Sequence, residues 1–588
     1  MTRDELLERL KGHEWNDIEF KSAQNDVSKT AYETVSAFAN TSGGWLVFGV
    51  RQNNGDFEII GVIQVDKVQN DFLSALRSPD KISYIIDVKS YLLDEQGRTV
   101  MAFFIPEAPR HVKPVFLERT PNKAYIRQGG SDMKCTADEL ARMIRDASDQ
   151  RYDEQTVDLD VNKCFDAEAL RWYRSMFNAR YQEKDASISD IDFLQQWGLV
   201  TVQRDAVVPT RASILLFGTP ESLLQILPRL VVDCQWINAR RGDVMPDQRW
   251  EDRLTVENNL IWAWRNLSDF FARHSETPFA IQGDTLQRVD VPPDYLAFRE
   301  AAINLLIHQD YSDHSGKGLI QFFRDQTVFE NPGDAFVTER EMLETGDKPV
   351  RNPRIVNAFR RIGLSEAAGT GIRAIFNGWR QLQRVPPQVE NDRGRKIFRL
   401  TLPKEELLTE RQLLLEAGMG VRLNEMEAAV FAFATRQQRL TVLDAQYVVG
   451  RNTKSAFEVL ERLIVQGLLT KVVAIPEPYY EMAPHLKDIL SGAQRFLLEL
   501  GLLQWRIVEV TDAPRSLTQL LTLVGLKRSA KESFVRDEIQ PLLRAHILDM
   551  GLPDKPLEAR GQRLVLSAIG VKLRDRRIRE GLPPLPPS

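Results

Sequence analysis

A glycine-rich turn that leads directly into an apolar strand is the feature that most restricts how the first part of this chain can fold. Residues 36–44 (SAFANTSGG) end a run in which Val27, Ala31, Val35 and Phe38 recur at helical spacing, and the apolar segment WLVFGV (45–50) follows at once. Glycine permits such tight turns because it carries no Cβ atom. The chain therefore changes from helix to core strand within a few residues, which predicts an α+β domain.

Short apolar runs and turns continue to about residue 150. Residues 45–51 and 57–62 predict two strands, and the intervening Asn54-Gly55 is a hairpin signal. Further strands are expected at 100–106 and 123–128. Residues 137–147 predict a closing helix, and the polar segment 146–156 is typical of a linker. The first predicted domain is therefore residues 1–150.

Composition excludes several classes of protein. A chain of 588 residues predicts three to five domains, at roughly 100–200 residues per domain. The formal charge is −5, so any nucleic-acid site has to be a local basic face. Three widely separated cysteines exclude a disulfide scaffold. Because no run of about 18 apolar residues occurs, we expect no membrane span and a cytoplasmic protein.

The middle of the chain predicts a second α+β region at residues 158–405. Residues 158–205 predict a helical connector, and strands then alternate with helices. We expect a strand at ASILLFG (212–218) and long helices near 252–273 and 294–309.

The C-terminal third predicts two similar domains. Helices are expected at 424–437, 441–450 and 453–467, followed by an apolar strand. Three helices and a hairpin are the order of a winged helix-turn-helix, which we assign to residues 418–485. The pattern recurs in residues 490–588, which end in a basic tail.

The N-terminal motifs resemble the Schlafen AlbA-type domain over about residues 10–150. Glu19-Phe20-Lys21, SAFANTSGG with its Gly-Val strand, and AYIRQGGSD (124–132) occur in that domain's order. The resemblance implies nucleic-acid contact. In relatives that cleave RNA it also implies a divalent-metal site of two glutamates five residues apart and a later aspartate.

Glu14 and Glu19 match the two glutamates of that resemblance, but Gln52 stands at the aspartate position. An amide brings no charge to a hard cation such as Mg²⁺ or Mn²⁺, and Asp56 lies four residues further on. The candidate catalytic residues are Glu14, Glu19 and Lys21, and the candidate metal ligands are Glu14, Glu19 and Asp56. Candidate phosphate contacts are Lys21, Lys113, Lys123 and Arg127. The alternative for Glu19 and Lys21 is an exposed pair that forms a weak salt bridge.

A polar stripe marks the predicted helix at 295–311. Glu300, Asn304 and His308 are spaced four residues apart and share one face, which either meets water or lines a cleft. Together with Asn331-Pro332-Gly333 and Gly369-Thr370-Gly371, this layout resembles the degenerate GHKL-type ATPase found as a RecG-related C-terminal region. The chain has no GxxxxGK[ST] loop, so helicase activity is not supported.

The GHKL resemblance implies an α/β sandwich that takes ATP with Mg²⁺. The matching positions are Glu300, Asn304, Asn331, Gly333, Gly369 and Gly371. The alternative for this domain is a dimerisation platform, and we expect a homo-oligomer.

Lys and Arg residues lie at the start of the two predicted recognition helices. Phosphates and base edges in a major groove are contacted by such cations. They are Arg451 and Lys454 in the first winged domain, and Lys527, Arg528 and Lys531 in the second. The alternative is a winged helix that binds only protein.

Three hypotheses follow. The favoured one is a DNA-binding transcriptional regulator whose N-terminal and middle domains sense a nucleic acid or nucleotide. The second is a Schlafen-like metal-dependent endoribonuclease that acts in stress or antiviral defence. The third is an oligomeric scaffold without catalysis. DNA or RNA is the expected partner, and metal-dependent nuclease and weak ATPase activities both stay open.

Overall fold

The computed structural model divides the chain into two compact units. The first is Met1–Leu382 with Pro387–Lys404, and the second is Gln383–Pro386 with Glu405–Ser588. Within residues 17–579 the structure describes all but 54–55, 149, 182–187, 205, 244–248, 275–291, 345, 347, 366–370, 410–411, 414–415, 417–420, 422, 438, 473–477 and 487–499. In this described part no helix combines the length and the apolar character needed to cross a membrane.

The N-terminal part of the first unit is built on a four-stranded sheet. Its elements are β1 (Ile18–Lys21), α2 (Lys29–Asn40), β2 (Gly44–Phe48), β3 (Val50–Asn53), β4 (Asp56–Ile59), α3 (Val65–Ala75), β5 (Lys89–Glu95), β6 (Arg98–Ile105), β7 (Tyr125–Gln128), β8 (Ser131–Lys134) and α4 (Ala137–Ala147). The strand order is β1-β2-β6-β5, with β1 parallel to β2 and the other neighbours antiparallel. Two separate hairpins, β3–β4 and β7–β8, complete this α+β domain.

The predicted change from helix to strand is confirmed at residues 36–44. Gly43 has a φ of +73°, and a Cβ atom there would lie 2.8 Å from the carbonyl oxygen of Ile105. The buried Asn40 side chain fastens the end of α2: its amide donates to the carbonyl oxygens of Val115 (2.8 Å) and Tyr125 (3.0 Å), and its oxygen accepts from the Val115 N–H. This motif therefore holds the domain together.

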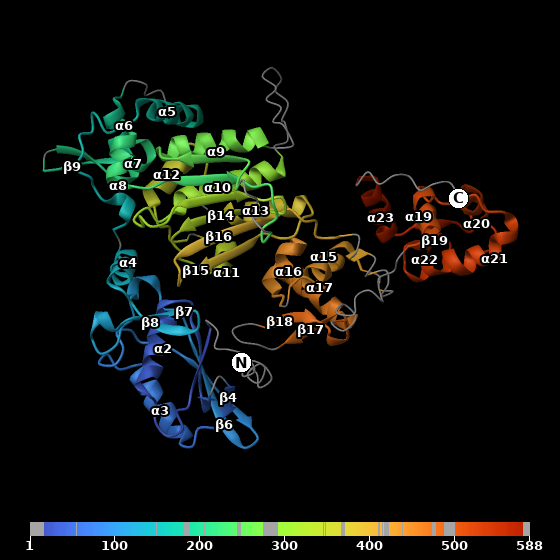
Figure 1. The fold of residues 1–588 in the computed structure, drawn as a ribbon, viewed down its shortest axis with the longest axis horizontal. Coiled ribbons are helices and arrows are strands. Elements are labelled where there is room, and N and C mark those ends of the chain that lie inside the picture. The colour runs from blue at the N-terminus through green and yellow to red at the C-terminus, as the bar shows by residue number, and fades with distance from the viewer. Residues whose placement is uncertain are drawn as a thin grey trace. The chain divides into compact units, whose positions relative to one another are not determined.

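The rest of the first unit is a six-stranded sheet and its helices. Its elements are α5 (Ala167–Tyr181), α6 (Asp190–Gln196), β9 (Val200–Gln203), β10 (Ala206–Pro209), α7 (Arg211–Phe217), α8 (Pro220–Ile226), β11 (Val232–Trp236), β12 (Asp252–Val256), α9 (Leu260–His274), α10 (Pro293–His308), β13 (Gly318–Phe322), β14 (Gln326–Pro332), α11 (Glu339–Leu343), α12 (Pro353–Arg361), α13 (Gly371–Gln381), β15 (Gln388–Asp392) and β16 (Ile397–Pro403). The strand order is β12-β11-β13-β14-β16-β15. Helices α9, α10 and α13 lie together on one side of the sheet (Figure 1) and share its hydrophobic core.

Two predictions for this region were wrong. ASILLFG forms most of helix α7, which Thr210 caps by accepting from the Ser213 N–H, and residues 212–217 of α7 are all buried. A short apolar run has no periodicity that separates a buried strand from a buried helix. The predicted helix at 252–273 is strand β12 followed by α9.

The expected linker at 146–156 also differs, because part of it is buried. Asp153 is fully buried, and its carboxylate accepts the backbone N–H groups of Arg354 (2.8 Å) and Ile355 (3.1 Å). These two groups belong to the first turn of α12, where the Asn352 side chain bonds elsewhere. Asp153 thus caps a helix 200 residues away in sequence.

The second unit contains two hydrophobic clusters, each with helices and a two-stranded antiparallel sheet. The first group is α15 (Glu425–Ala434), α16 (Val442–Val449), α17 (Thr453–Val465), β17 (Leu469–Val472) and β18 (Tyr479–Met482), which confirms the three predicted helices. The second is α19 (Leu502–Val510), α20 (Leu517–Leu523), η4 (Arg528–Ala530), α21 (Lys531–Ser533), η5 (Phe534–Ile539), α22 (Gln540–Arg544), β19 (Leu548–Met550), β20 (Leu564–Leu566) and α23 (Ala568–Arg579).

Substitution Asp153→Ala is expected to destabilise the first unit by about 1–2 kcal/mol, because two buried N–H groups lose their acceptor. Calorimetry of thermal unfolding measures the change. Asp158→Ala is the control, since Asp158 is exposed and near in sequence. Equal effects of the two substitutions would contradict the capping role.

A pH dependence accompanies this cap. Burial raises the pKa of Asp153 to about 7 from an ordinary 3.8, so the folded state holds this proton more tightly than the unfolded state. The stability of the first unit should therefore fall as pH rises from about 4 to 7. Asp153→Asn, which cannot ionise, should lessen that fall in the same measurement.

Candidate nucleic-acid and nucleotide sites

Glu19 lies in a buried cluster of charges in the N-terminal sheet, where β1 places it beside two cations. Its side chain is only 9% exposed, one oxygen accepts from Lys21, and the other lies 2.8 Å from an Nη atom of Arg127. The expected alternative, an exposed Glu–Lys pair, was wrong because the domain encloses the glutamate. The carboxylate is neutralised by two cationic side chains.

Arg127 is the centre of this cluster. Its side chain is 1% exposed; it pairs with Glu19 and with Asp132 (2.9 Å), donates to the Ile18 carbonyl oxygen (2.8 Å), and lies over the Phe38 ring. All of these partners belong to the domain itself. The prediction that Arg127 contacts a phosphate is therefore corrected to an internal role, since a buried and paired guanidinium is not available to a ligand.

Lys113 is also paired with groups inside the protein. It donates to Glu107 (2.6 Å) and to the Asn40 carbonyl oxygen (3.1 Å), and its side chain is 13% exposed. Burial and the nearby Lys396 lower the pKa of Lys113 to about 7. This prediction of a phosphate contact is also corrected. Of the four candidates in this domain, Lys21 at 21% exposure and Lys123 at 44% exposure stay open to solvent, and Lys123 pairs with Glu118.

The described residues do not fit a divalent cation at Glu19. Among them, no group of three or more His, Cys, Asp or Glu side chains is placed to hold a metal ion. Gln52 is exposed on β3. Glu14 lies outside the described residues, and Asp56 is described only as the first residue of β4. The lysine and the arginine occupy the two oxygens of Glu19 that a cation would need.

A cavity opens in the six-stranded domain beside α10. It encloses about 1080 Å³ of empty space including its open mouth, similar to the roughly 300–1,000 Å³ of small-molecule sites. Five predicted nucleotide-binding residues line it: Glu300, Asn304, Asn331, Gly333 and Gly371. The sixth, Gly369, lies outside the described residues. The polar stripe of α10 therefore lines a cleft.

Polar residues from α10 and β14 line the cavity. Asn331 of β14 is 4% exposed, and Glu300 of α10 pairs with its neighbour Arg299 at 2.9 Å. Gly371 starts α13 so close to α10 that a Cβ atom would lie 3.0 Å from Asn304 Nδ2. Burial and the charge of Arg351 lower the pKa of His308 to about 4, so its imidazole is neutral at physiological pH.

Sequence reasoning missed the part of the cavity wall that follows β14. Asp334, Phe336 and Arg351 line it, and Arg351 lies over the Phe336 ring at 4.4 Å. Arg351 also pairs with Asp146 (3.0 Å) at the end of α4 and with Asp310 (3.4 Å). No motif joins these residues in sequence. Asp334 directly follows Asn331-Pro332-Gly333, and this adjacency is the signal that the sequence offers.

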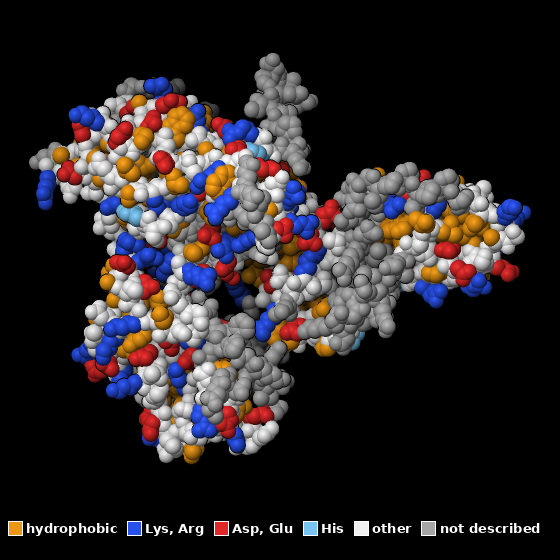
Figure 2. All heavy atoms as spheres, viewed as in Figure 1, with side chains coloured by type: hydrophobic (Ala, Val, Ile, Leu, Met, Phe, Trp, Pro, Cys, Tyr) orange, Lys and Arg blue, Asp and Glu red, His pale blue; other side chains and the backbone are white. Residues whose placement is uncertain are grey.

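The predicted cations of the second unit are exposed. Lys527 and Arg528 precede and begin η4, and neither makes an ion pair with a described residue, whereas Lys531 lies 3.7 Å from Glu558. Figure 2 shows Lys and Arg side chains, with some acidic ones, around α20 and α21. This helical group offers cations to a polyanion.

The other group of the second unit offers a different surface. Arg451 and Lys454 are exposed at the start of α17. The outward positions that follow include Phe457 (41% exposed), Glu458 and Val465 (87% exposed). Apolar and acidic side chains suit a protein partner better than a phosphate backbone.

Comparison with known proteins gives three family matches. Residues 14–136 match "Schlafen, AlbA_2", residues 141–233 match a domain of unknown function, and residues 317–402 match "Putative ATP-dependent DNA helicase recG C-terminal". None of the curated proteins matches the chain.

Two solved structures are similar to parts or most of the chain. The DIP2311 protein from Corynebacterium diphtheriae is 17% identical, covers 94% of this chain and 95% of its own, and has a TM-score of 0.37. The N-terminal domain of a RecG-related protein from Nitrosomonas europaea is 34% identical, covers 23% of this chain and 92% of its own, and has a TM-score of 0.19.

Substitution Arg127→Met is expected to destabilise the N-terminal domain by about 3–5 kcal/mol, because it removes the cation that faces Asp132 and leaves Glu19 with Lys21 alone. Denaturant unfolding measures the loss. Lys134→Met on the same hairpin is the control, since Lys134 is exposed. Adding Glu19→Gln to Arg127→Met should restore part of the stability. No recovery would show that the Glu19 pair is not the cause.

Proposed function

We propose that this chain, which combines a Schlafen AlbA_2 domain with an ATPase-like module of the recG C-terminal type, is a nucleic-acid-binding regulator. In this proposal the Schlafen domain binds a nucleic acid without cutting it. The ATPase-like module binds a nucleotide, and the last helical group contacts duplex DNA.

The observation that carries the proposal is the state of Glu19. A nuclease of the metal-dependent kind needs carboxylates that are free to bind a cation. Glu19 instead pairs with Lys21 and Arg127, and a glutamine stands at position 52. With its charge matched, Glu19 does not repel a phosphate backbone, so the site favours binding over cleavage.

The cavity supports the second part of the proposal. Asn331, Gly333 and Gly371 would hold the nucleotide, and Glu300 and Asn304 would offer oxygen atoms to its Mg²⁺. Asn331 is 4% exposed and lines the cavity, so its carboxamide is within reach of a ligand there. A nucleobase has adjacent donors and acceptors that an asparagine can meet. The Mg²⁺ ion would neutralise phosphate charge.

The second unit supports the contact with duplex DNA. Each of its two groups has helices followed by a two-stranded antiparallel sheet, the order of a winged helix. We assign the DNA contact to Lys527, Arg528 and Lys531, because these cations adjoin the helical segment from α21 to α22. Arg451 and Lys454 stay secondary candidates, since α17 presents apolar and acidic side chains beside them.

Substitution Gly371→Val is expected to weaken ATP binding at least about tenfold, because the new side chain would fill the space beside Asn304 and Glu300. Titration of the full chain with ATP and Mg²⁺, followed by calorimetry, measures the affinity. Gln381→Val is the control on the exposed end of the same helix. Unchanged affinity in Gly371→Val would place ATP elsewhere.

Reversal of two charges, Lys527→Glu with Arg528→Glu, is expected to weaken duplex binding and to lower the slope of log affinity against log salt by about 2–4. Fluorescence anisotropy with a labelled duplex at several salt concentrations measures both quantities. Arg451→Glu with Lys454→Glu tests the secondary candidates in the other helical group in the same way, and a smaller effect is expected there. The assignment fails if affinity is unchanged at every ionic strength.

The same preparations decide between binding and cleavage. Single-stranded RNA and duplex DNA incubated with the full chain and Mn²⁺ should stay intact while they are bound. Degradation that requires Mn²⁺ and disappears in Glu19→Gln would overturn the binding-only proposal and establish the nuclease. If the full chain binds neither the RNA nor the DNA, the hypothesis of an oligomeric scaffold is the one that remains.

A further inference from the structure

The ATPase-like module reaches into the Schlafen domain through one turn, the segment 392–396 that joins β15 to β16. This hairpin turn is defined here as Asp392, Arg393, Gly394, Arg395 and Lys396. Arg393 is 8% exposed and pairs with Glu107 of the Schlafen domain. Gln128 Nε2 donates to the Gly394 carbonyl oxygen at 3.4 Å. A buried arginine at a turn is costly unless it has this partner, so the contact is a specific one.

Gly394 lies against the backbone of Arg127, the residue that forms an ion pair with Glu19. A Cβ atom at position 394 would lie 3.0 Å from the carbonyl oxygen of Arg127, a separation at which one side has to move. Arg127 is the internal partner of Glu19 and Asp132. The hairpin turn therefore fixes the backbone from which the central guanidinium of the Schlafen site extends.

The other end of the hairpin turn belongs to the cavity wall. The Gly333 N–H donates to the Lys396 carbonyl oxygen at 2.7 Å, and Lys396 pairs with Asp334 at 3.4 Å. Gly333, Asp334 and Phe398 all line the cavity. Only three residues of one chain segment separate Gly394, which lies against Arg127, from Phe398, which lines the cavity.

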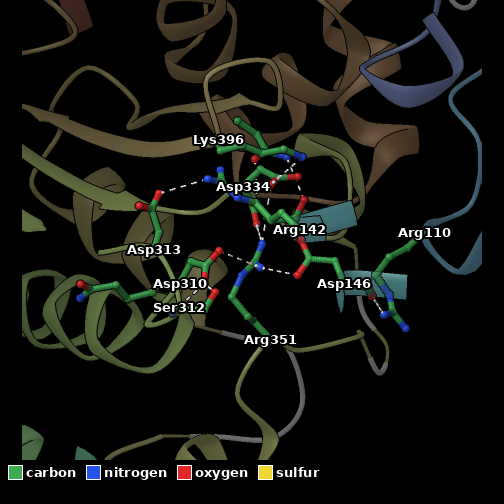
Figure 3. A network of polar contacts seen from close by, with 12 residues as sticks. Arg110, Arg142, Asp146, Asp310, Ser312, Asp313, Asp334, Arg351 and Lys396 are labelled. Carbon is green, nitrogen blue, oxygen red and sulfur yellow. Dashed lines mark hydrogen bonds and ion pairs between the residues drawn. The ribbon is translucent and has the colours of Figure 1, made fainter. Parts of the chain in front are cut away.

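A second set of contacts joins the cavity wall to the Schlafen domain. Figure 3 shows Arg351 at its centre, between Asp310 and Asp146. Arg110 donates to the carbonyl oxygen of Asp146 at the end of α4, and both Arg110 and Arg351 lie over the ring of Phe336, which lines the cavity. A ligand that displaces Phe336 would disturb these contacts.

We infer that the hairpin turn 392–396 is a positioning element. It couples the binding of a ligand in the cavity to the affinity of the Schlafen domain for nucleic acid. This inference rests on the proposed function, because it takes a nucleotide and a nucleic acid as the two ligands. Buried ion pairs and close backbone contacts hold one geometry and do not deform gradually, so a shift of β16 has to be passed on to Arg127. Coupling between two binding sites is reciprocal.

The test measures the dissociation constant of the full chain for a fluorescein-labelled single-stranded RNA, with and without saturating ATP and Mg²⁺. The coupling factor is the ratio of the two constants. In the unsubstituted chain we expect a factor of at least about five, in either direction, as coupled sites typically show about 5- to 150-fold. Because a purely structural role would change each affinity alone, the coupling factor is the quantity that reports positioning.

Two variants break the path at different points. Gly394→Ala forces the turn away from the Arg127 carbonyl oxygen, and Glu107→Gln removes the charge opposite Arg393. Both should bring the coupling factor to within about twofold of one, while the affinity for RNA alone and for ATP alone changes by less than about twofold. Arg395→Ala is the matched control, since Arg395 lies on the same turn, is 75% exposed and pairs only with Asp392 among the described residues.

The outcomes separate the inference from the function on which it rests. A chain that binds both ligands with a coupling factor of one contradicts the inference and leaves the proposed function standing. A coupling factor that survives in both Gly394→Ala and Glu107→Gln also contradicts it. If the unsubstituted chain binds only one ligand or neither, the proposed function fails and the coupling falls with it.

Discussion

Burial of charge in matched pairs is the constraint on which the first unit depends. Arg127 is almost fully enclosed, and it is tolerated there because Glu19 and Asp132 face it and the Ile18 carbonyl oxygen accepts from it. An isolated ion in this position would cost several kcal/mol. The same pairing that permits the fold also engages both oxygens of Glu19, and the proposal of binding without cleavage rests on this.

The same constraint explains the contacts between the ATPase-like module and the Schlafen domain, which are made by buried ion pairs. Arg351 and Arg393 are both enclosed, and each finds an acidic partner on the Schlafen domain, Asp146 and Glu107 respectively. Asp153 completes the connection by capping α12. Because these groups need one another, the segment around residue 150 cannot act as a free linker. Under the proposed function, this arrangement gives a change at the cavity a physical route to the Schlafen domain.

Several site predictions depended on short motifs in which the type and spacing of the residues indicate where the side chains lie. Glu300, Asn304 and His308 were placed on one face of a helix by their spacing, and that face lines the cavity. The exposure of Lys527 and Arg528 agrees with their place at a turn before a helix. Arg127 and Lys113 were assigned to the surface because a cation in a polar motif is usually exposed. Glu19, one partner of Arg127, is distant in sequence, and no motif marks Glu107 as the partner of Lys113, so the sequence offers no reason to bury these cations.

The sequence by itself determined the order of the domains, the helix-to-strand turn at 36–44, the helices α4, α10 and α15 to α17, and the resemblance to two families. These features depend on glycine, periodicity and short motifs, which act over a few residues. The tertiary structure alone decided that ASILLFG is a helix, that Asp153 is buried, and that Arg351 joins Asp146 to the cavity. Each of these depends on contacts between residues far apart in the chain. Whether a charge is buried, or an apolar run becomes a helix, is decided by the residues that the fold places against it.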